Sequence, residues 1–362
     1  MSRDAPDRKL RYGWTTGACA AAAARGAHEG LRTGRFPDAV TITLPKGQRP
    51  RFDLVATARG AGWAQAGIVK DAGDDPDVTH GATVIARVEP GLPGAGVTFR
   101  AGEGVGTVTR AGLPIPPGEP AINPAPRAMI AAALAESVAA HGGDSDVVVT
   151  ISIPGGEALA LKTLNGRLGI VGGLSILGTT GIVVPFSCAA WIHSIHRGID
   201  VARAAGLTHV AAATGSTSEA AVQRLHALPE MALLDMGDFV GGTLKYLRTH
   251  PVARVTIAGG FGKLAKLAQG ALDLHSGASR LDMAALARLA AAAGVDARGC
   301  DAIAGAAGAG EALVLAGAAG GALADLVAQN ARATALGVLA GGVSVDVVVF
   351  DRDGRLLGQA GA

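Results

Sequence analysis

The sequence predicts two α/β architectures in one chain: an N-terminal mixed α+β domain and a C-terminal Rossmann-like domain with a parallel sheet. Three observations lead to this expectation. The 362 residues exceed what one hydrophobic core usually serves, about 250–300 residues. Strand-like runs crowd the first half, whereas short strands alternate with helices in the second. We therefore expect a mixed domain over residues 1–195 and a Rossmann-like domain over 196–362.

The first half is expected to place two helices among many strands. An alanine-rich helix spans residues 18–30, with Thr15 and Thr16 as candidate N-caps. A second helix begins at Pro124, because Asn123 can cap it and proline suits the first helical position. Glycine and proline separate the strand-like runs, which favours some antiparallel pairing. These runs are 40–44, 52–58, 64–69, 83–88, 97–100, 147–153 and 158–162.

The second half changes rhythm after a helix expected over residues 186–205. Short strands and helices then follow one another, a pattern typical of a parallel sheet with crossover helices. A late strand over 343–350 can join the same sheet. The expected strands are 210–213, 232–235 and 254–258, and the expected helices are 218–227, 239–247 and 263–272.

Composition excludes several classes of protein. The formal net charge of +2 and an aromatic content of 3% argue against binding to nucleic acid. Residues 168–192 lack charged side chains, but glycines and a proline break them, so we expect no membrane span there. The N-terminus lacks an apolar signal region, and the three cysteines lie far apart. We therefore expect a cytoplasmic protein without disulfides.

The segment KDAGDDPDVTHG, residues 70–81, places four aspartates beside Lys70 and His80. The aspartate spacing does not fit a calcium loop, and one histidine is too few for zinc. Composition alone favours a solvated turn, because Asp, Gly and Pro all favour turns. Crowded like charges cost stability unless partners offset them, which keeps a functional loop in consideration.

Two turns in the second half are candidate ligand sites. Thr214, Gly215 and Ser216 follow an expected strand and lead into a helix, as in nucleotide sites. Asp235 ends the next strand, where a ribose-binding acid is expected. The third turn, GGFGK, contains Gly259, Gly260 and Lys263 but lacks the Walker pattern, and no GxGxxG is present. Ordinary turns between strand and helix explain these patterns equally well.

Cations and histidines give weaker signals. Arg127 lies in the first turn of a helix, where a cation opposes the helix dipole. It suits either an anionic ligand or an acidic partner within the fold, and the partner is favoured. His193 and His196 are three residues apart, but no further His or Cys pair lies nearby, so helix-surface histidines are favoured over a metal site.

Taken in order, these stretches resemble the CbiD family of cobalt-precorrin-5B C-1-methyltransferases of cobalamin biosynthesis. The resemblance extends from the first helix into the last third of the chain and is weaker beyond about residue 295. KDAGDDPDVTHG and SILGTTGIV are the most specific stretches. The matching stretches are YGWTTGACAAAAA (12–24), LPKG (44–47), KDAGDDPDVTHG (70–81), GEGVGTVTRAGLP (102–114), GEPAINPAPRAMI (118–130), ISIPGGEALALKTLNGRLGIVGGLSILGTTGIVVP (151–185), GGFGKLAKLAQG (259–270) and LHS (274–276).

The resemblance implies methyl transfer from S-adenosyl-L-methionine to C-1 of cobalt-precorrin-5B, giving cobalt-precorrin-6A. Cobalt belongs to the polycarboxylate tetrapyrrole substrate, and no protein-bound metal is expected. A dinucleotide-dependent tetrapyrrole reductase and a non-catalytic tetrapyrrole-binding protein are the alternatives, and a homo-oligomer is left open. The implied donor site lies in the second half, at Thr214, Gly215, Ser216, Asp235, Gly259, Gly260 and Lys263.

The same resemblance assigns roles in the first half. Asp74, Asp75 and His80 are the expected catalytic residues, which orient ligands or handle a proton. The expected substrate-binding residues are Thr15, Thr16, Lys70, Asp71, Asp77, Arg127, Lys162, Arg167, Ser175, Thr179 and Thr180.

Overall fold

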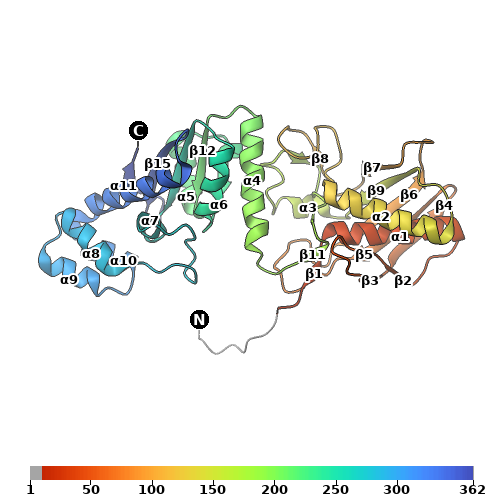
Figure 1. Cartoon of the computed structure of the whole chain (residues 1–362), viewed down its shortest axis with the longest axis horizontal. Helices are drawn as coiled ribbons and strands as arrows, with labels where there is room; N and C mark the ends of the chain where they lie inside the picture. Colours follow the sequence, from red (N-terminus) through yellow and green to blue (C-terminus); the bar gives the residue numbers. More distant parts are fainter. Residues whose placement is uncertain (1–9, 362) are drawn as a thin grey trace. The chain divides into compact units, whose positions relative to one another are not determined.

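The computed structural model describes residues 10–361, which combine helices with several β-sheets (Figure 1). The chain divides into two compact units between Ser187 and Cys188. The expected boundary at residues 195 and 196 falls inside helix α4 (Cys188–Ala204), and this whole helix belongs to the second unit. Ile195, Ile199 and Ala202 on α4 pack into the second unit's core, which explains why the division comes earlier.

A five-stranded sheet of order β4-β5-β6-β9-β7 forms the centre of the first unit. All neighbours pair antiparallel except β7 and β9, which are parallel. The expected antiparallel pairing in this half is therefore confirmed. The strands are β4 (Val55–Gly60), β5 (Trp63–Val69), β6 (Thr83–Pro90), β7 (Val97–Ala101) and β9 (Val147–Ser152).

Two long helices pack against each other beside this sheet. In α1 (Thr16–Thr33) the alanines are buried, and their small side chains allow close contact with α2 and with β5 and β6. Thr15 is the N-cap of α1, and its Oγ1 accepts a hydrogen bond from the Ala18 N–H at 3.2 Å. Helix α2 (Pro124–His141) begins as expected, with Asn123 at the N-cap and proline in the first turn.

Short elements complete the first unit. The expected strand over residues 158–162 is wrong, because helix α3 (Gly156–Ala160) occupies most of this segment. Alternation over five residues also fits one helical turn, and Leu161 is 88% exposed rather than buried in a sheet. The remaining strands are β1 (Gly13–Trp14), β2 (Ala39–Thr41), β3 (Arg51–Asp53), β8 (Thr107–Val108), β10 (Ile170–Val171) and β11 (Ile182–Val183).

The second unit contains a five-stranded sheet of order β13-β12-β14-β15-β16. The first four strands are parallel, and β16 pairs antiparallel with β15 at the edge. The late strand expected over residues 343–350 therefore joins this sheet, whereas the sequence did not predict β16. The strands are β12 (His209–Ala213), β13 (Leu233–Asp235), β14 (Arg254–Gly260), β15 (Ser344–Phe350) and β16 (Leu356–Ala360).

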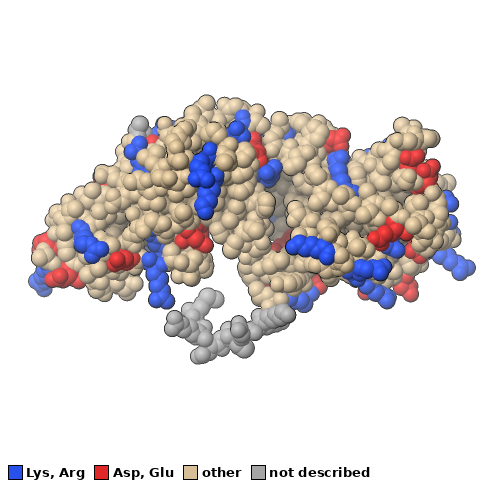
Figure 2. Space-filling view, viewed as in Figure 1, with Lys and Arg blue, Asp and Glu red and all other residues tan. Residues whose placement is uncertain are grey.

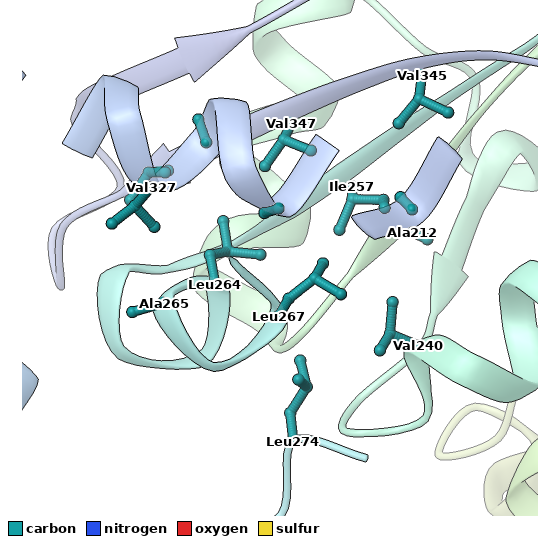
Figure 3. Packing of buried hydrophobic residues seen from close by; sticks show 14 of the residues in the cluster. Ala212, Val240, Ile257, Leu264, Ala265, Leu267, Leu274, Val327, Val345 and Val347 are labelled. Carbon is teal, nitrogen blue, oxygen red and sulfur yellow. The ribbon is translucent and has the colours of Figure 1, made fainter. Parts of the chain in front are cut away.

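Helices cover both faces of this sheet. Helix α5 (Ser216–His226) packs on one face, where Val222 contacts the cluster that contains Ala211 and Val348. The opposite face carries the larger core, which includes Leu264, Val327 and Ile257 (Figure 3). The helices of this larger core include α4, α6 (Val240–Thr249), α7 (Phe261–Ala268), α8 (Met283–Ala292), α9 (Ala297–Ala304), α10 (Ala309–Leu315) and α11 (Gly320–Leu339).

The uncharged segment 168–192 is broken into β10, β11 and the start of α4, as expected. Within residues 10–361, no single helix is long and apolar enough to cross a membrane. One pair of helices, 309–315 and 317–339, bent by 115°, meets the criterion together by length and composition. Basic and acidic side chains are interspersed on the face drawn in Figure 2.

Candidate functional site

The second unit has a change of chain direction at the carboxyl ends of β12 and β14. From β12 the chain passes through α5 to β13 on one side, then through α6 to β14 on the other side. Ligands of open parallel sheets bind where the strand order reverses in this way. Thr214 follows β12, and Gly260 ends β14, so the two expected ligand turns lie side by side.

A cleft of about 1080 Å³ opens at this edge of the sheet. It is lined by the first turns of α5 and α7, by α10, and by the chain that follows β15. The lining residues are Thr214, Gly215, Ser216, Thr217, Ser218, Gly260, Phe261, Gly262, Lys263, Gly310, Glu311, Leu313, Val314, Phe350, Asp351, Arg352 and Leu357.

Lys263 connects the two ligand turns. Its Nζ donates to the Thr214 carbonyl at 2.8 Å and lies 3.0 Å from an Asp238 carboxylate oxygen. Gly259 allows the turns to approach, since a Cβ at this position would lie 2.8 Å from the Thr214 Oγ1. These contacts hold the two turns together at the base of the cleft. The rest of its lining carries charges of both signs.

Five of the seven residues expected to hold a cofactor line this cleft: Thr214, Gly215, Ser216, Gly260 and Lys263. Gly259 and Asp235 do not line it. The Asp235 carbonyl accepts a hydrogen bond from the Trp191 indole N–H at 3.0 Å. The proposed ribose contact of Asp235 stays a prediction.

Sequence reasoning did not identify Glu311, Asp351 and Arg352, which also line the cleft. Asp351 and Arg352 reach the cleft because β15 pairs with β14, whereas Glu311 reaches it because α10 packs against α7. Asp351 and Arg352 directly follow the predicted strand 343–350, and this position at the end of a strand could have identified them.

In the first unit, the acidic loop of residues 70–81 lies against residues 11–14. Arg11 forms a bidentate ion pair with Asp71, with one N–H to oxygen distance of 2.9 Å. This hydrogen-bonded guanidinium, together with the Gly73 N–H, lowers the pKa of Asp71 to about 2. The Arg11 N–H also donates to Asp74 at 2.7 Å. Sequence reasoning missed Arg11 because 60 residues separate it from Asp71.

Lys70 is 2% exposed and forms an ion pair with Asp77. Its Nζ also donates to the Thr79 hydroxyl at 2.5 Å. Burial opposes ionisation of Asp77, but the Lys70 ammonium and hydrogen bonds from Thr79 outweigh it and lower the pKa of Asp77. The charge of Lys70 is thus buried against an internal carboxylate, and its expected contact with a substrate carboxylate stays a prediction.

The three expected catalytic residues also have partners in this unit. Asp75 accepts a hydrogen bond from the Phe186 N–H at 2.8 Å, and Asp74 is held by Arg11. The His80 Nδ1 accepts from the Ala72 N–H at 3.1 Å, and its side chain is 53% exposed. The carboxylates thus stabilise the loop conformation, whereas the His80 ring remains accessible to solvent.

The remaining substrate candidates are in different environments. Arg127 is held by Glu119 at 3.1 Å and by the Ile122 carbonyl at 2.8 Å, as the alternative of a partner within the fold predicts, and its expected contact with a substrate anion stays a prediction. Lys162 is exposed. Thr15 and Thr16 are buried at the start of α1, whereas Thr179 is exposed and Arg167 is half-buried. Ser175 donates a hydrogen bond to Asn165, and Thr180 forms hydrogen bonds within its own turn.

No group of three or more His, Cys, Asp or Glu side chains that could hold a metal ion occurs within residues 10–361. His196 instead stacks on Tyr246, with ring centroids 3.9 Å apart. His193 is exposed, as expected of a helix-surface histidine, whereas His196 is partly buried and its Nε2 is not accessible to solvent.

The fold is that of a mixed α/β protein with a cleft at the carboxyl edge of a parallel sheet. A family model described as CbiD matches residues 3–185, and one described as CbiD, C-terminal domain, matches residues 273–361. The chain belongs to the CbiD family, which confirms the resemblance seen in its motifs.

Curated relatives named cobalt-precorrin-5B C(1)-methyltransferase are similar over nearly the whole chain. The relative from Bradyrhizobium sp. (strain BTAi1) is 60% identical over 98% of this chain and 95% of its own length. The relative from Brucella anthropi is 60% identical over 97% and 96%. A crystal structure of a cobalamin biosynthesis protein (cbiD) from Archaeoglobus fulgidus is 28% identical, covers 70% of this chain and 78% of that chain, and has a TM-score of 0.40.

Proposed function

We propose that this chain transfers a methyl group from S-adenosyl-L-methionine to C-1 of cobalt-precorrin-5B, giving cobalt-precorrin-6A in cobalamin biosynthesis. The 60% identity to relatives with this named activity, over nearly full length, supports the reaction. The cleft at the carboxyl ends of β12 and β14 is the observation that carries the assignment of the donor site.

The second unit is proposed as a Rossmann-like donor domain. Its cleft volume of about 1080 Å³ is ample for a nucleoside. The first-turn N–H groups of α5 suit hydroxyl or anionic oxygens, and Lys263 fixes the two turns that would flank the ligand. S-adenosyl-L-methionine supplies an electrophilic methyl group on a sulfonium, and the residues of the cleft bind and orient it.

The first unit is proposed to take the tetrapyrrole. Beside the acidic loop, Tyr12 and Phe186 are 59% and 65% exposed, and Val184 is 48% exposed. Such side chains suit the flat apolar faces of a macrocycle, whereas exposed Lys162 suits its peripheral carboxylates. Thr179 and the neighbouring glycines would let the backbone approach the ring closely.

The chain's contribution to the reaction is chiefly positional. The macrocycle carbon is itself nucleophilic and the leaving group is a neutral thioether, so no covalent link to the protein is required. Holding the reacting atoms in line can supply several kcal/mol, roughly up to 7–11 in well-oriented systems. Because the His80 Nδ1 accepts a hydrogen bond, the neutral ring carries its proton on Nε2, where it can hold a substrate oxygen.

A ligand titration separates the proposed function from the two alternatives. The full-length protein is titrated by calorimetry with S-adenosylhomocysteine and, separately, with NADPH. The methyltransferase binds only the former, a reductase binds the latter, and a tetrapyrrole carrier binds neither. Detection of NADPH binding alone would overturn the proposal.

A double substitution tests the catalytic role of the loop. Asp74→Asn with Asp75→Asn keeps an acceptor oxygen at both positions, so we expect melting temperature to stay close to that of the wild type. Single-turnover methyl transfer should fall at least about tenfold, equivalent to 1.4 kcal/mol at the transition state. Loss of activity only in proportion to a lowered melting temperature would show that both carboxylates are structural.

A further inference from the structure

A second pocket, of about 460 Å³, lies in the same unit and shares Gly262 and Lys263 with the cleft. The LHS stretch contributes three of its lining residues, although the donor site described above does not use it. The polar lining comprises Asp238, Lys263, Lys266, His275 and Ser276.

The LHS stretch is held rigidly at this pocket. The Leu274 N–H donates to the Asp238 carbonyl at 2.9 Å, and the Leu274 carbonyl accepts from the Lys266 Nζ at 2.9 Å. The Leu274 side chain is 1% exposed and points towards the core that contains Leu267 (Figure 3). The hydrogen bonds of the Leu274 N–H and carbonyl hold the chain directly before His275 and Ser276, which line the pocket.

The pocket has hydrogen-bond donors to spare. Lys266 uses one of its three ammonium hydrogens on Leu274, and Lys263 uses one on Thr214, while its Nζ also forms an ion pair with Asp238 at 3.0 Å. The His275 Nδ1 accepts from the Gly277 N–H at 3.1 Å, so the neutral ring presents its proton on Nε2. These groups together suit a carboxylate, which accepts several hydrogen bonds at once.

Asp238 adds a carboxylate of its own to this basic pocket. We infer that the pocket binds the α-amino acid end of the methyl donor, with its carboxylate at Lys266 and His275 and its ammonium at Asp238. The inference rests on the proposed function, which places the donor's nucleoside in the adjoining cleft. Lys263 belongs to both linings and lies where one extended ligand would pass from the cleft to the pocket.

A substrate acetate or propionate group is the competing occupant. It carries no positive charge, so Asp238 would repel it, whereas a zwitterion satisfies both signs of charge. The presence of a carboxylate beside two lysines therefore favours the amino acid end of the donor.

The test compares two ligands that differ only in the amino acid portion. S-adenosylhomocysteine carries the carboxylate and the ammonium, whereas 5′-methylthioadenosine retains the nucleoside and sulfur without them. Both are titrated by calorimetry into the full-length wild type, Lys266→Gln and Lys245→Gln. Lys245 is an exposed lysine on α6 outside both pockets, so its variant controls for the lost charge.

We expect Lys266→Gln to lower the affinity for S-adenosylhomocysteine at least tenfold and to leave the affinity for 5′-methylthioadenosine unchanged. Lys245→Gln should bind both ligands as the wild type does. Equal weakening of both ligands would show a distorted cleft and overturn the inference. Unchanged S-adenosylhomocysteine affinity with weaker tetrapyrrole binding would assign the pocket to the substrate instead. A wild type that binds neither nucleoside would refute the donor site of the proposed function, and this inference with it.

Discussion

Arg11 organises the acidic loop through contacts of two kinds, a bidentate ion pair with Asp71 and main-chain hydrogen bonds with Asp74. Each of the four aspartates in residues 70–81 accepts at least one hydrogen bond from the first unit. Repulsion among these carboxylates is thereby offset within the fold. The crowding of charge that singled out this loop is explained without a ligand, and a catalytic role depends on activity measurements.

The Asp71 pair gives a prediction about pH. Because the pKa of Asp71 falls from 3.8 to about 2 on folding, its stabilisation is present above pH 4 and is lost as pH falls towards 2. Asp71→Asn should flatten the loss of stability across this window, by a modest amount because both side chains are about half exposed. Urea unfolding at several pH values measures this, and an unchanged acid limb would contradict it.

Arg127 and Lys162 make a matched comparison of a partly buried and an exposed cation. Arg127→Met should lower the free energy of unfolding by about 1–3 kcal/mol, because main-chain carbonyls of residues 120 and 122 lose a charged donor. Lys162→Met should leave stability within about 0.5 kcal/mol and raise the Michaelis constant for the tetrapyrrole. If both variants were equally stable and equally impaired in substrate binding, the structural role assigned to Arg127 would be wrong.

Short-range signals predicted the elements whose ends are chemically marked. Asn123 and Pro124 located the start of α2, and the alternation of strands and helices located β12, α5, β13, α6 and β14. The α3 segment was mistaken for a strand because five alternating residues fit both structures. No local pattern specifies contacts distant in sequence. Asp351 reaches the cleft because β15 pairs with β14, and Arg11 reaches Asp71 because residues 11–14 lie against the acidic loop.

Strand β1 depends on close approach of two glycine-bearing segments. A Cβ on Gly13 would lie 2.0 Å from the Ala72 carbonyl carbon, so even alanine must displace the acidic loop. Gly13→Ala should destabilise the first unit by about 1–3 kcal/mol or more. Gly166→Ala is the control, because nothing lies within 4 Å of its Cβ position. Hydrogen exchange should show the loss within residues 10–187, and equal effects of the two variants would refute the steric argument.

At the scale of the molecule, each unit has its own hydrophobic core. One large cluster contains residues such as Ala22, Ile130 and Ile151 of the first unit, and another contains Ile257, Leu264 and Val347 of the second. The sequence predicted this separation from length and from the change in pattern. It placed the boundary inside α4, since a helix of 17 residues carries no mark of which core its apolar face joins.

Separate cores predict that donor binding stabilises one unit selectively. A ligand at 100 times its dissociation constant stabilises its binding state by about 2.7 kcal/mol. Saturating S-adenosylhomocysteine should therefore slow amide exchange in β12, β14 and α7 of the second unit, while exchange in β5, β6 and β9 stays unchanged. Hydrogen–deuterium exchange with mass spectrometry, resolved by peptide, measures both units in one sample. The Lys266→Gln variant serves as control, because its weaker affinity should reduce the protection at a fixed ligand concentration. Protection that rose only within residues 10–187 would move the donor to the first unit, and protection that rose equally throughout would show that the two cores unfold together.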